Sequence, residues 1–231
     1  MMLKDSCILL LSGGLDSVTL LHYLVKREKY RQVYAISFLY GQKHLKEIRC
    51  AEWQMNVLEM KGHFVVDLSF LSVLLQGSST LITGGGDVPR LDEIREEDKV
   101  QPSTYVPNRN MIFLSIASAW AETLHIQDVY YSAQAHDEYG YWDCTEPFVT
   151  NINAVLSLNR KHKIRVNAPF ISFSKKEILQ IGFSLGVDYS HTWSCYRGEE
   201  NACGTCPTCI ERLKAFEAIG RNDPLPYLNG K

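Results

Sequence analysis

The chain has 231 residues, enough for one domain with a full hydrophobic core, and its formal net charge is −2 with 22% charged residues. This balance excludes attraction of nucleic acid by bulk positive charge. No apolar run approaches the roughly 20 residues of a membrane span, and residues 1–6 lack the apolar region of a signal peptide, so we expect a cytoplasmic protein.

A glycine turn joins the first predicted strand to the first predicted helix. The apolar run from Cys7 ends in Ser12-Gly13-Gly14, and helical spacing of apolar residues begins just after Asp16-Ser17. Two glycines let the backbone approach a ligand closely, while serine hydroxyls and free amide hydrogens of the first helical turn point toward it. This stretch therefore predicts a phosphate site, and the alternative is an ordinary turn capped by Ser or Asp.

Strand and helix patterns alternate along the chain. Further strands are expected at 32–39, 64–68, 129–133 and 164–168, and further helices at 45–60, 111–124, 148–158 and after a capping box at 174–177. This alternation is typical of α/β proteins with a doubly wound parallel sheet, whose ligands bind beyond the carboxyl ends of the strands. Residues 76–104 interrupt the pattern with glycines and a charged run, and we expect a mobile insertion or lid there.

Several charged side chains are expected at the carboxyl edge of the sheet. Lys43 and His44 follow the second strand, where they either contact phosphates or begin a solvated helix. Arg109 lies at a helix start that Asn108 or Asn110 can cap, so it either binds a phosphate or carboxylate or forms a surface ion pair. Lys175 or Lys176 opposes the dipole of its own helix, which indicates a nearby ligand phosphate.

Residues 136–144 combine acids with aromatic rings at the end of a predicted strand. Asp137 and Asp143 lie six residues apart, with Tyr141 and Trp142 between them. A carboxylate can accept ring and exocyclic N–H donors while an aromatic face stacks, so the loop suits a flat nitrogen heterocycle. The alternative is a tyrosine-rich surface loop.

Four of the seven cysteines fall within fifteen residues, at positions 195, 203, 206 and 209. Their number and spacing predict a closed tetrahedral zinc site of structural rather than catalytic type, with an iron–sulfur cluster or free thiols as alternatives. We expect Cys7, Cys50 and Cys144 in the core or a pocket, and a thiol beside Asp143 could act as a nucleophile.

Together these motifs resemble the 7-cyano-7-deazaguanine synthase (QueC) family. The matching strings are Ser12-Gly-Gly-Leu-Asp-Ser17, Tyr40-Gly-Gln-Lys-His44, Val106-Pro-Asn-Arg-Asn110, Asp137-x-x-Gly-Tyr-x-Asp-Cys144, Thr192-Trp-Ser-Cys195-Tyr and Cys203-Gly-x-Cys-x-x-Cys209. The resemblance implies an adenine nucleotide alpha-hydrolase-like, PP-loop ATP pyrophosphatase domain over 1–190 and a small zinc-binding helical region over 191–231. It also implies a homodimer.

The same resemblance implies an ATP-dependent ligase. Such enzymes adenylate the carboxylate of 7-carboxy-7-deazaguanine, aminate it with ammonia to an amide, and use a second ATP to form the nitrile precursor of queuosine. The implied cofactors are ATP, Mg²⁺ and one structural Zn²⁺ per chain.

Roles for individual residues follow from the resemblance. ATP would contact Leu11, Ser12, Gly13, Gly14, Leu15, Asp16, Ser17, Lys43 and His44. The catalytic group would comprise Asp16, Ser17, Arg109 and Lys175. The substrate would contact Arg109, Asp137, Tyr141, Trp142 and Asp143, and zinc would bind Cys195, Cys203, Cys206 and Cys209.

The chain departs from the family pattern in one loop, which has Trp142 and Thr145 where the family usually has Pro and Arg. Losing a planar five-donor cation changes how a carboxylate is oriented. One alternative is therefore a QueC-like enzyme of anti-phage defence that joins the activated deazaguanine to an amine of a partner protein. Two others are a tRNA-modifying PP-loop ligase and a non-catalytic nucleotide sensor.

Overall fold

Five parallel strands form the central sheet of the computed structural model, which describes residues 4–43, 45–60, 62–94, 101–134, 141–197 and 200–228. They are β1 (Lys4–Leu10), β2 (Tyr30–Leu39), β3 (His63–Asp67), β4 (Asp128–Tyr130) and β5 (Arg165–Asn167). Their order is β3-β2-β1-β4-β5, and every neighbouring pair is parallel. The order reverses direction at β1, so the crevice for a ligand lies beyond the carboxyl ends of β1 and β4.

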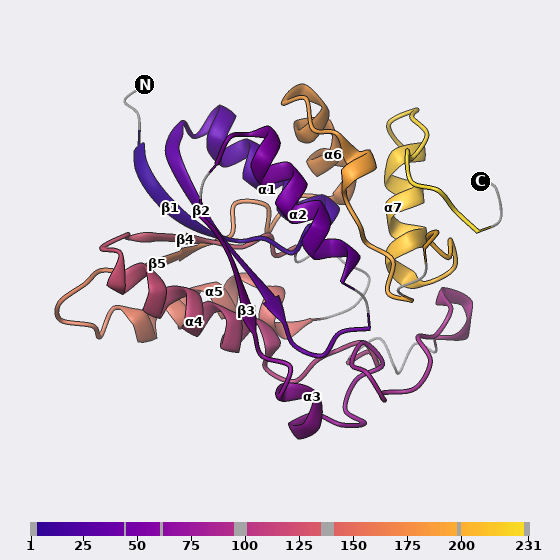
Figure 1. Ribbon diagram of the computed structural model, residues 1–231, viewed down its shortest axis with the longest axis horizontal. Coiled ribbons are helices and arrows are strands. Elements are labelled where there is room, and N and C mark those ends of the chain that lie inside the picture. Colours follow the sequence, from indigo (N-terminus) through magenta and orange to yellow (C-terminus); the bar gives the residue numbers. More distant parts are fainter. Residues whose placement is uncertain are drawn as a thin grey trace.

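Helices cover both faces of the sheet (Figure 1). The helices α1 (Leu15–His22), α2 (Lys46–Val57), α6 (Lys175–Ser184) and α7 (Pro207–Glu217) lie on one face. The opposite face is covered by α4 (Arg109–Thr123) and α5 (Glu146–Leu156). Shorter elements are η1 (Tyr23–Arg27), α3 (Leu71–Leu74), η2 (Leu91–Glu93), η4 (Trp142–Cys144) and η5 (Tyr189–His191). The predicted doubly wound α/β fold is confirmed.

Alternate residues of β1 enter two different cores. Cys7 and Leu9 pack with α1, α6 and α7, whereas Ile8 packs with α4 and α5, and all three side chains are fully buried. This follows from the two-residue period of a strand that is covered on both faces. Cys7 is therefore a core residue, as expected.

All the predicted strands occur in the structure, with ends that differ from the predicted ones by up to three residues. Residues 129–133 were expected to be extended, but β4 ends at Tyr130, opposite Asn167 where β5 also ends. Tyr131 still donates its amide hydrogen to Asn167 O over 3.1 Å, and residues 131–134 then line the cavity described below. The ladder stops because its partner strand stops.

The start of α4 differs from the expectation that an asparagine side chain caps it. Asn108 occupies the N-cap position with φ +54°, but its side chain makes no capping hydrogen bond. Asp143, from a distant loop, instead accepts a hydrogen bond from Asn110 N at 3.3 Å. This contact fastens the loop at 141–145 to the helix that carries Arg109.

The boundary at residue 190 and the mobility of residues 76–104 stay predictions. Within the described part of the insertion, Leu81, Ile82 and Val88 are buried in a cluster with Trp193 and the four clustered cysteines. No helix in the described ranges is both long and apolar enough to cross a membrane.

Candidate active site

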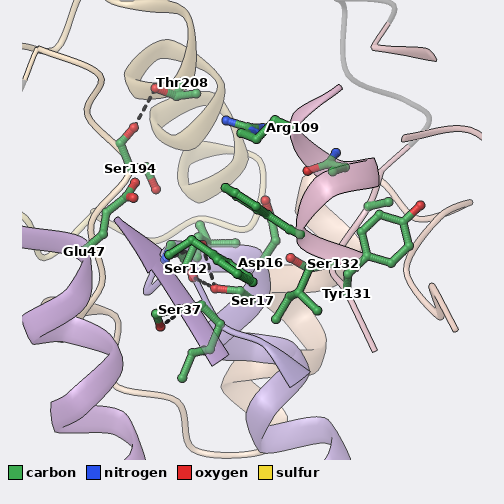
Figure 2. Close-up of a pocket in the computed structure, with 18 of the residues that line it drawn as sticks. Ser12, Asp16, Ser17, Ser37, Glu47, Arg109, Tyr131, Ser132, Ser194 and Thr208 are labelled. Carbon is green, nitrogen blue, oxygen red and sulfur yellow. Dashed lines mark hydrogen bonds between the residues drawn. The ribbon is translucent and has the colours of Figure 1, made fainter. Parts of the chain in front are cut away.

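A cavity of 260 Å³ opens beyond the carboxyl ends of β1, β2 and β4. Its wall combines residues of the glycine loop, the first turns of α2 and α4, Lys175 of α6 and the segment before α7. Figure 2 shows Ser12, Asp16 and Ser17 at its centre, with Arg109 reaching in from α4. Of the nine predicted ATP-binding residues, the following line it: Leu11, Ser12, Gly14, Leu15, Asp16 and Ser17.

The two serines of the glycine loop organise its backbone. Ser12 Oγ lies 3.0 Å from Ser17 Oγ and accepts a hydrogen bond from Gly14 N at 3.2 Å, while Ser17 Oγ accepts one from Gly13 N at 3.2 Å. The N-cap of α1 is Gly14, which has no side chain with which to cap the helix. Within the described ranges, the Ser or Asp cap of the alternative interpretation is therefore not found at this position, and we expect the amino end of α1 to face a ligand.

Gly13 is required by its backbone and by its neighbour. It has φ +88°, and a Cβ built on it would lie 2.0 Å from Glu47 O in α2. Trp193 donates its amide hydrogen to Gly13 O over 3.0 Å. The loop is thus held between the first turn of α2 and the segment before the cysteine cluster.

Lys175 bridges two carboxylates at the rim of the cavity. Its Nζ lies 3.4 Å from Asp16 Oδ2 and 3.4 Å from Glu211 Oε2, and the three residues border an adjoining cavity of 110 Å³. These acids offset the unfavourable position of a lysine at a helix start, and a ligand phosphate near Lys175 stays a prediction. Asp16 Oδ1 is buried and has no hydrogen-bond partner among the described residues.

Arg109 also reaches the cavity, from the first turn of α4. Its Nη1 donates to Tyr40 OH at 3.4 Å, and its guanidinium lies 5.9 Å from the centre of the Tyr40 ring. It forms no surface ion pair with a described residue. Burial raises the pKa of Tyr40, an effect that the positive charge of Arg109 partly opposes. Tyr40 therefore stays a neutral partner that leaves the charge of Arg109 available to an anion.

Lys43 points away from the cavity, because its amine donates to Gly86 O in the insertion. His44 lies outside the described residues, as does Asp137. For the ATP and substrate contacts of these three residues, the structure offers no supporting geometry, and the contacts stay predictions.

Two described residues of the predicted substrate loop at 136–144 line the cavity, Tyr141 and Cys144. The hydroxyl of Tyr141 lies 2.6 Å from Thr104 Oγ1. Trp142 is 42% exposed and donates from Nε1 to Tyr105 OH at 2.8 Å. Asp143 is buried behind the wall, where burial raises the pKa of its carboxyl and Arg109 opposes that shift.

The cavity includes residues that sequence reasoning missed. Glu47 lies on its wall, and burial raises the pKa of this carboxyl to about 8. Arg212 is 1% exposed and donates to both oxygens of Asp223, at 2.6 and 2.9 Å, and to Thr192 Oγ1 at 2.8 Å. The only signal for Glu47 was its place one turn after Lys43-His44, and for Arg212 its place within the cysteine-bearing helix.

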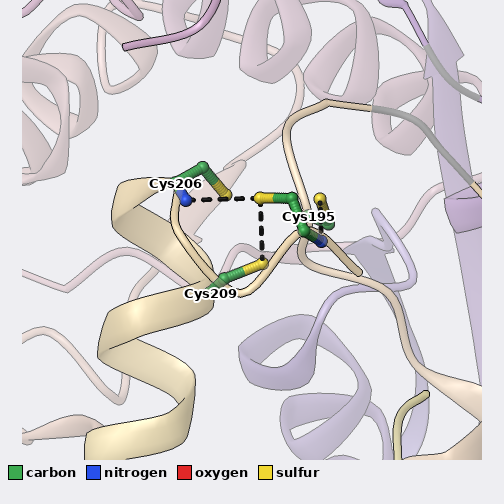
Figure 3. Close-up of side chains that lie close together, drawn as sticks. Cys195, Cys206 and Cys209 are labelled. Carbon is green, nitrogen blue, oxygen red and sulfur yellow. Dashed lines mark hydrogen bonds between the residues drawn. The ribbon is translucent and has the colours of Figure 1, made fainter. Parts of the chain in front are cut away.

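The four clustered cysteines meet beside α7 (Figure 3). All four are buried, and their sulfur atoms lie within 4.8 Å of one another, with Cys203 Sγ 3.9 Å from Cys209 Sγ. Four thiolates around one tetrahedral ion, with metal–sulfur bonds of about 2.3 Å, lie at comparable distances. In a [4Fe–4S] cluster each thiolate binds a different iron, which spreads the sulfurs further apart. The geometry favours a single metal ion.

Comparisons with solved structures find the same fold. A 4-thiouridine synthetase in complex with RNA and ATP matches with a TM-score of 0.51 and 18% identity, covering 91% of this chain and 50% of the other. The U34-tRNA thiolase NcsA from Methanococcus maripaludis matches with a TM-score of 0.50 and 14% identity, covering 84% and 62%. At these identities the likeness concerns the fold alone.

Sequence relatives are much more similar. The 7-cyano-7-deazaguanine synthase of Caldicellulosiruptor saccharolyticus is 44% identical over 220 residues, covering 95% of this chain and 94% of the relative. The 7-cyano-7-deazaguanine synthase of Clostridium kluyveri is 43% identical over 230 residues, covering 97% and 98%. The profile of the family described as "Queuosine biosynthesis protein QueC" matches residues 6–220. Because the profile and the relatives both span nearly the whole chain, this chain belongs to the QueC family.

Proposed function

We propose that this chain is a 7-cyano-7-deazaguanine synthase, an ATP-dependent carbon–nitrogen ligase. It adenylates the carboxylate of 7-carboxy-7-deazaguanine, aminates it with ammonia to the amide, and converts the amide to the nitrile with a second ATP. The observation that carries the proposal is the 260 Å³ cavity, which joins the glycine loop to Arg109 and Lys175 in a chain that matches the family over residues 6–220.

The catalysis that we propose is positioning and charge stabilisation. The Ser12 and Ser17 hydroxyls and the amino end of α1 bind phosphate oxygens, and Lys175 and Arg109 stabilise negative charge that develops between the α and β phosphates. Tyr141, and Asp137 as the resemblance implies, orient the deazaguanine, while Asp143 acts from behind the wall by holding the loop to the start of α4. No protein nucleophile is needed, because an acyl adenylate is already activated.

Two metals fit the side chains that are present. Asp16 Oδ1, a buried carboxylate oxygen without a partner among the described residues, is a suitable ligand for Mg²⁺. When bound, Mg²⁺ neutralises charge on the departing pyrophosphate. The thiol groups of Cys195, Cys203, Cys206 and Cys209 fit one structural Zn²⁺, since four protein ligands fill a tetrahedral shell.

The two departures in the substrate loop have local explanations. Trp142 is hydrogen-bonded to Tyr105, and Thr145 caps α5 by accepting from Phe148 N at 3.4 Å. Neither contact favours a protein amine over ammonia. We therefore propose no second function.

The test is mass spectrometry of a reaction that contains the metal-loaded protein, Mg-ATP, 7-carboxy-7-deazaguanine and ammonium. We expect the nitrile, with AMP in twice its molar amount, and no nitrile from an Asp16→Asn variant. AMP without conversion of the deazaguanine, or a deazaguanine mass added to a protein, would overturn the proposal. We also propose a homodimer, which light scattering of the same preparation measures.

A further inference from the structure

Glu47 stands out among the carboxylates around the cavity. It lies in the first turn of α2, is half-buried and lines the cavity wall, which it reaches from the side opposite Arg109 (Figure 2). Within the described ranges, its carboxylate has no hydrogen-bond or ion-pair partner. The other acids are engaged: Asp16 and Glu211 face Lys175, and Asp143 caps α4.

The backbone of Glu47 is fixed relative to the glycine loop. Its carbonyl oxygen lies 2.0 Å, and Ala51 N lies 3.1 Å, from the place where a Cβ on Gly13 would be. This close packing leaves the loop and the first turn of α2 little room to move apart. The backbone that carries the Glu47 side chain therefore has a fixed position next to the ligand site of the glycine loop.

The surroundings of Glu47 suit a group that exchanges a proton near neutral pH. Burial raises its pKa to about 8, an effect that the positive charge of Arg109 only partly opposes. The charged and titratable groups that share the first turns of α2 or the cavity wall with it are Lys46, Arg49, Cys50, Asp16, Tyr40, Arg109, Tyr131, Tyr141, Cys144, Lys175, Tyr196 and Arg212. A base of this strength is well matched to catalysis at neutral pH.

The amination step of the proposed function needs such a base. Ammonium predominates over ammonia near neutral pH, and it has no lone pair with which to attack a carbonyl carbon. A carboxylate on the wall of the same cavity can bind the cation and also deprotonate it. We propose that Glu47 binds the incoming ammonium and accepts its proton, an inference that rests on the function proposed above.

One proton passes from ammonium to the Glu47 carboxylate, and the lone pair of the resulting ammonia forms the C–N bond with the acyl carbon. The C–O bond to AMP breaks, with its electron pair going to the AMP phosphate oxygen. A second proton leaves the nitrogen for that phosphate, so that the amide and AMP are released and Glu47 later returns its proton to solvent.

A Glu47→Gln variant tests the proposal through separate half-reactions. Pyrophosphate exchange into ATP that depends on 7-carboxy-7-deazaguanine should match the wild type, because adenylation needs no amine. Amide formation from ammonium at neutral pH should fall by about 100-fold or more. Hydroxamate formation from hydroxylamine, which is neutral at that pH, should fall by less than about threefold.

The pH profile gives a second readout. Amide formation by the wild type should rise with pH and level off above about 8, where Glu47 is deprotonated. In Glu47→Gln it should keep rising by about tenfold per pH unit through that range, following the concentration of free ammonia. Should Glu47→Gln not fold, Glu47→Asp keeps the carboxylate and should show the wild-type levelling at a rate reduced about tenfold.

The control is Glu52→Gln, which removes an exposed carboxylate of the same helix and should leave all three reactions unchanged. Equal losses with ammonium and hydroxylamine in Glu47→Gln would overturn the inference, and so would loss of pyrophosphate exchange or an unchanged rate with ammonium. If the wild type itself shows no exchange that depends on the deazaguanine, the proposed function fails rather than the role of Glu47.

Discussion

Gly13 has no room for a methyl group. Gly13→Ala combines a positive φ with a Cβ only 2.0 Å from Glu47 O, so we expect a loss of about 1–3 kcal/mol in the free energy of unfolding. Displacement of the loop should also reduce pyrophosphate exchange by about 100-fold. Urea denaturation and the exchange assay measure the two effects.

Gly14→Ala is the matched comparison for stability. Gly14 has φ −76°, and the nearest atoms to its Cβ position are Ser12 Oγ at 3.3 Å and Trp193 O at 3.5 Å. Because alanine is a poorer N-cap than glycine, we expect Gly14→Ala to lose about 1 kcal/mol or less in the free energy of unfolding, which is smaller than the loss for Gly13→Ala. Equal unfolding curves for the two alanine variants would contradict the requirement for glycine at position 13.

Among individual residues, the sequence predicted those at the centre of the cavity better than those on its walls. Local features of the sequence predicted three parts of the cavity wall. The two glycines indicated the glycine loop, a helix start indicated Arg109, and an unfavourable position in the helix dipole indicated Lys175. The sequence signals for Glu47 and Arg212 were too weak to single them out, since an acid at a helix start and a basic residue in a helix are common on solvated surfaces. Their roles depend on which helices and loops pack against them in the fold, and the neighbouring residues in the sequence do not determine that packing.

The helix α5 depends on Thr145, the residue that stands where the family usually has arginine. Thr145→Val removes the hydroxyl that accepts from Phe148 N, and we expect a loss of about 1 kcal/mol in the free energy of unfolding. Thr150→Val, at an exposed position of the same helix, should change it much less. Chemical denaturation of both variants measures these losses. Equal losses of unfolding free energy in the two variants would mean that Thr145 does not act as a cap.

A buried ion pair joins α7 to the segment that follows it. Asp223→Ala would strand the guanidinium of Arg212, which is 1% exposed, and should cost about 3–5 kcal/mol in the free energy of unfolding. Asp92→Ala breaks the exposed pair with Arg90 and should change thermal unfolding very little. A mild effect of Asp223→Ala would mean that water reaches Arg212.

The elements themselves were largely predictable. A two-residue period of apolar residues predicted the strands, and a 3.6-residue period predicted the helices. These periods appear because the packing of helices on the sheet determines which side chains of each element are buried. The length of β4 was not predictable, since Tyr131 and Ala133 are still buried after the ladder ends. The cap of α4 was also missed, because Asp143 lies more than thirty residues away along the chain.

Across the whole molecule, the cysteine cluster supports the cavity. Trp193 bonds to the glycine loop, Thr208 donates to Ser194 O at 2.7 Å, and both lie within a few residues of the predicted metal ligands. Metal removal by a chelator should therefore lower the melting temperature and weaken ATP binding together. Calorimetry and nucleotide titration on the same sample measure both.

Cysteine variants provide the matched control for the metal experiment. Cys206→Ser should lose bound metal and melt earlier, whereas Cys50→Ser, at a half-buried cysteine outside the cluster, should keep its metal. Metal analysis beside thermal unfolding compares the two. Equal metal content would show that the cluster does not hold the ion.

The hydrogen bond from Trp193 to Gly13 also has a consequence for synthesis on the ribosome. It joins residues that lie 180 positions apart in a chain of 231, and contacts between residues so far apart form late in folding. The glycine loop emerges first and has to wait for residue 193 and the cysteines before its geometry is complete. A nascent chain that has exposed only its first 150 residues would thus carry the nucleotide motif without yet being able to hold a nucleotide.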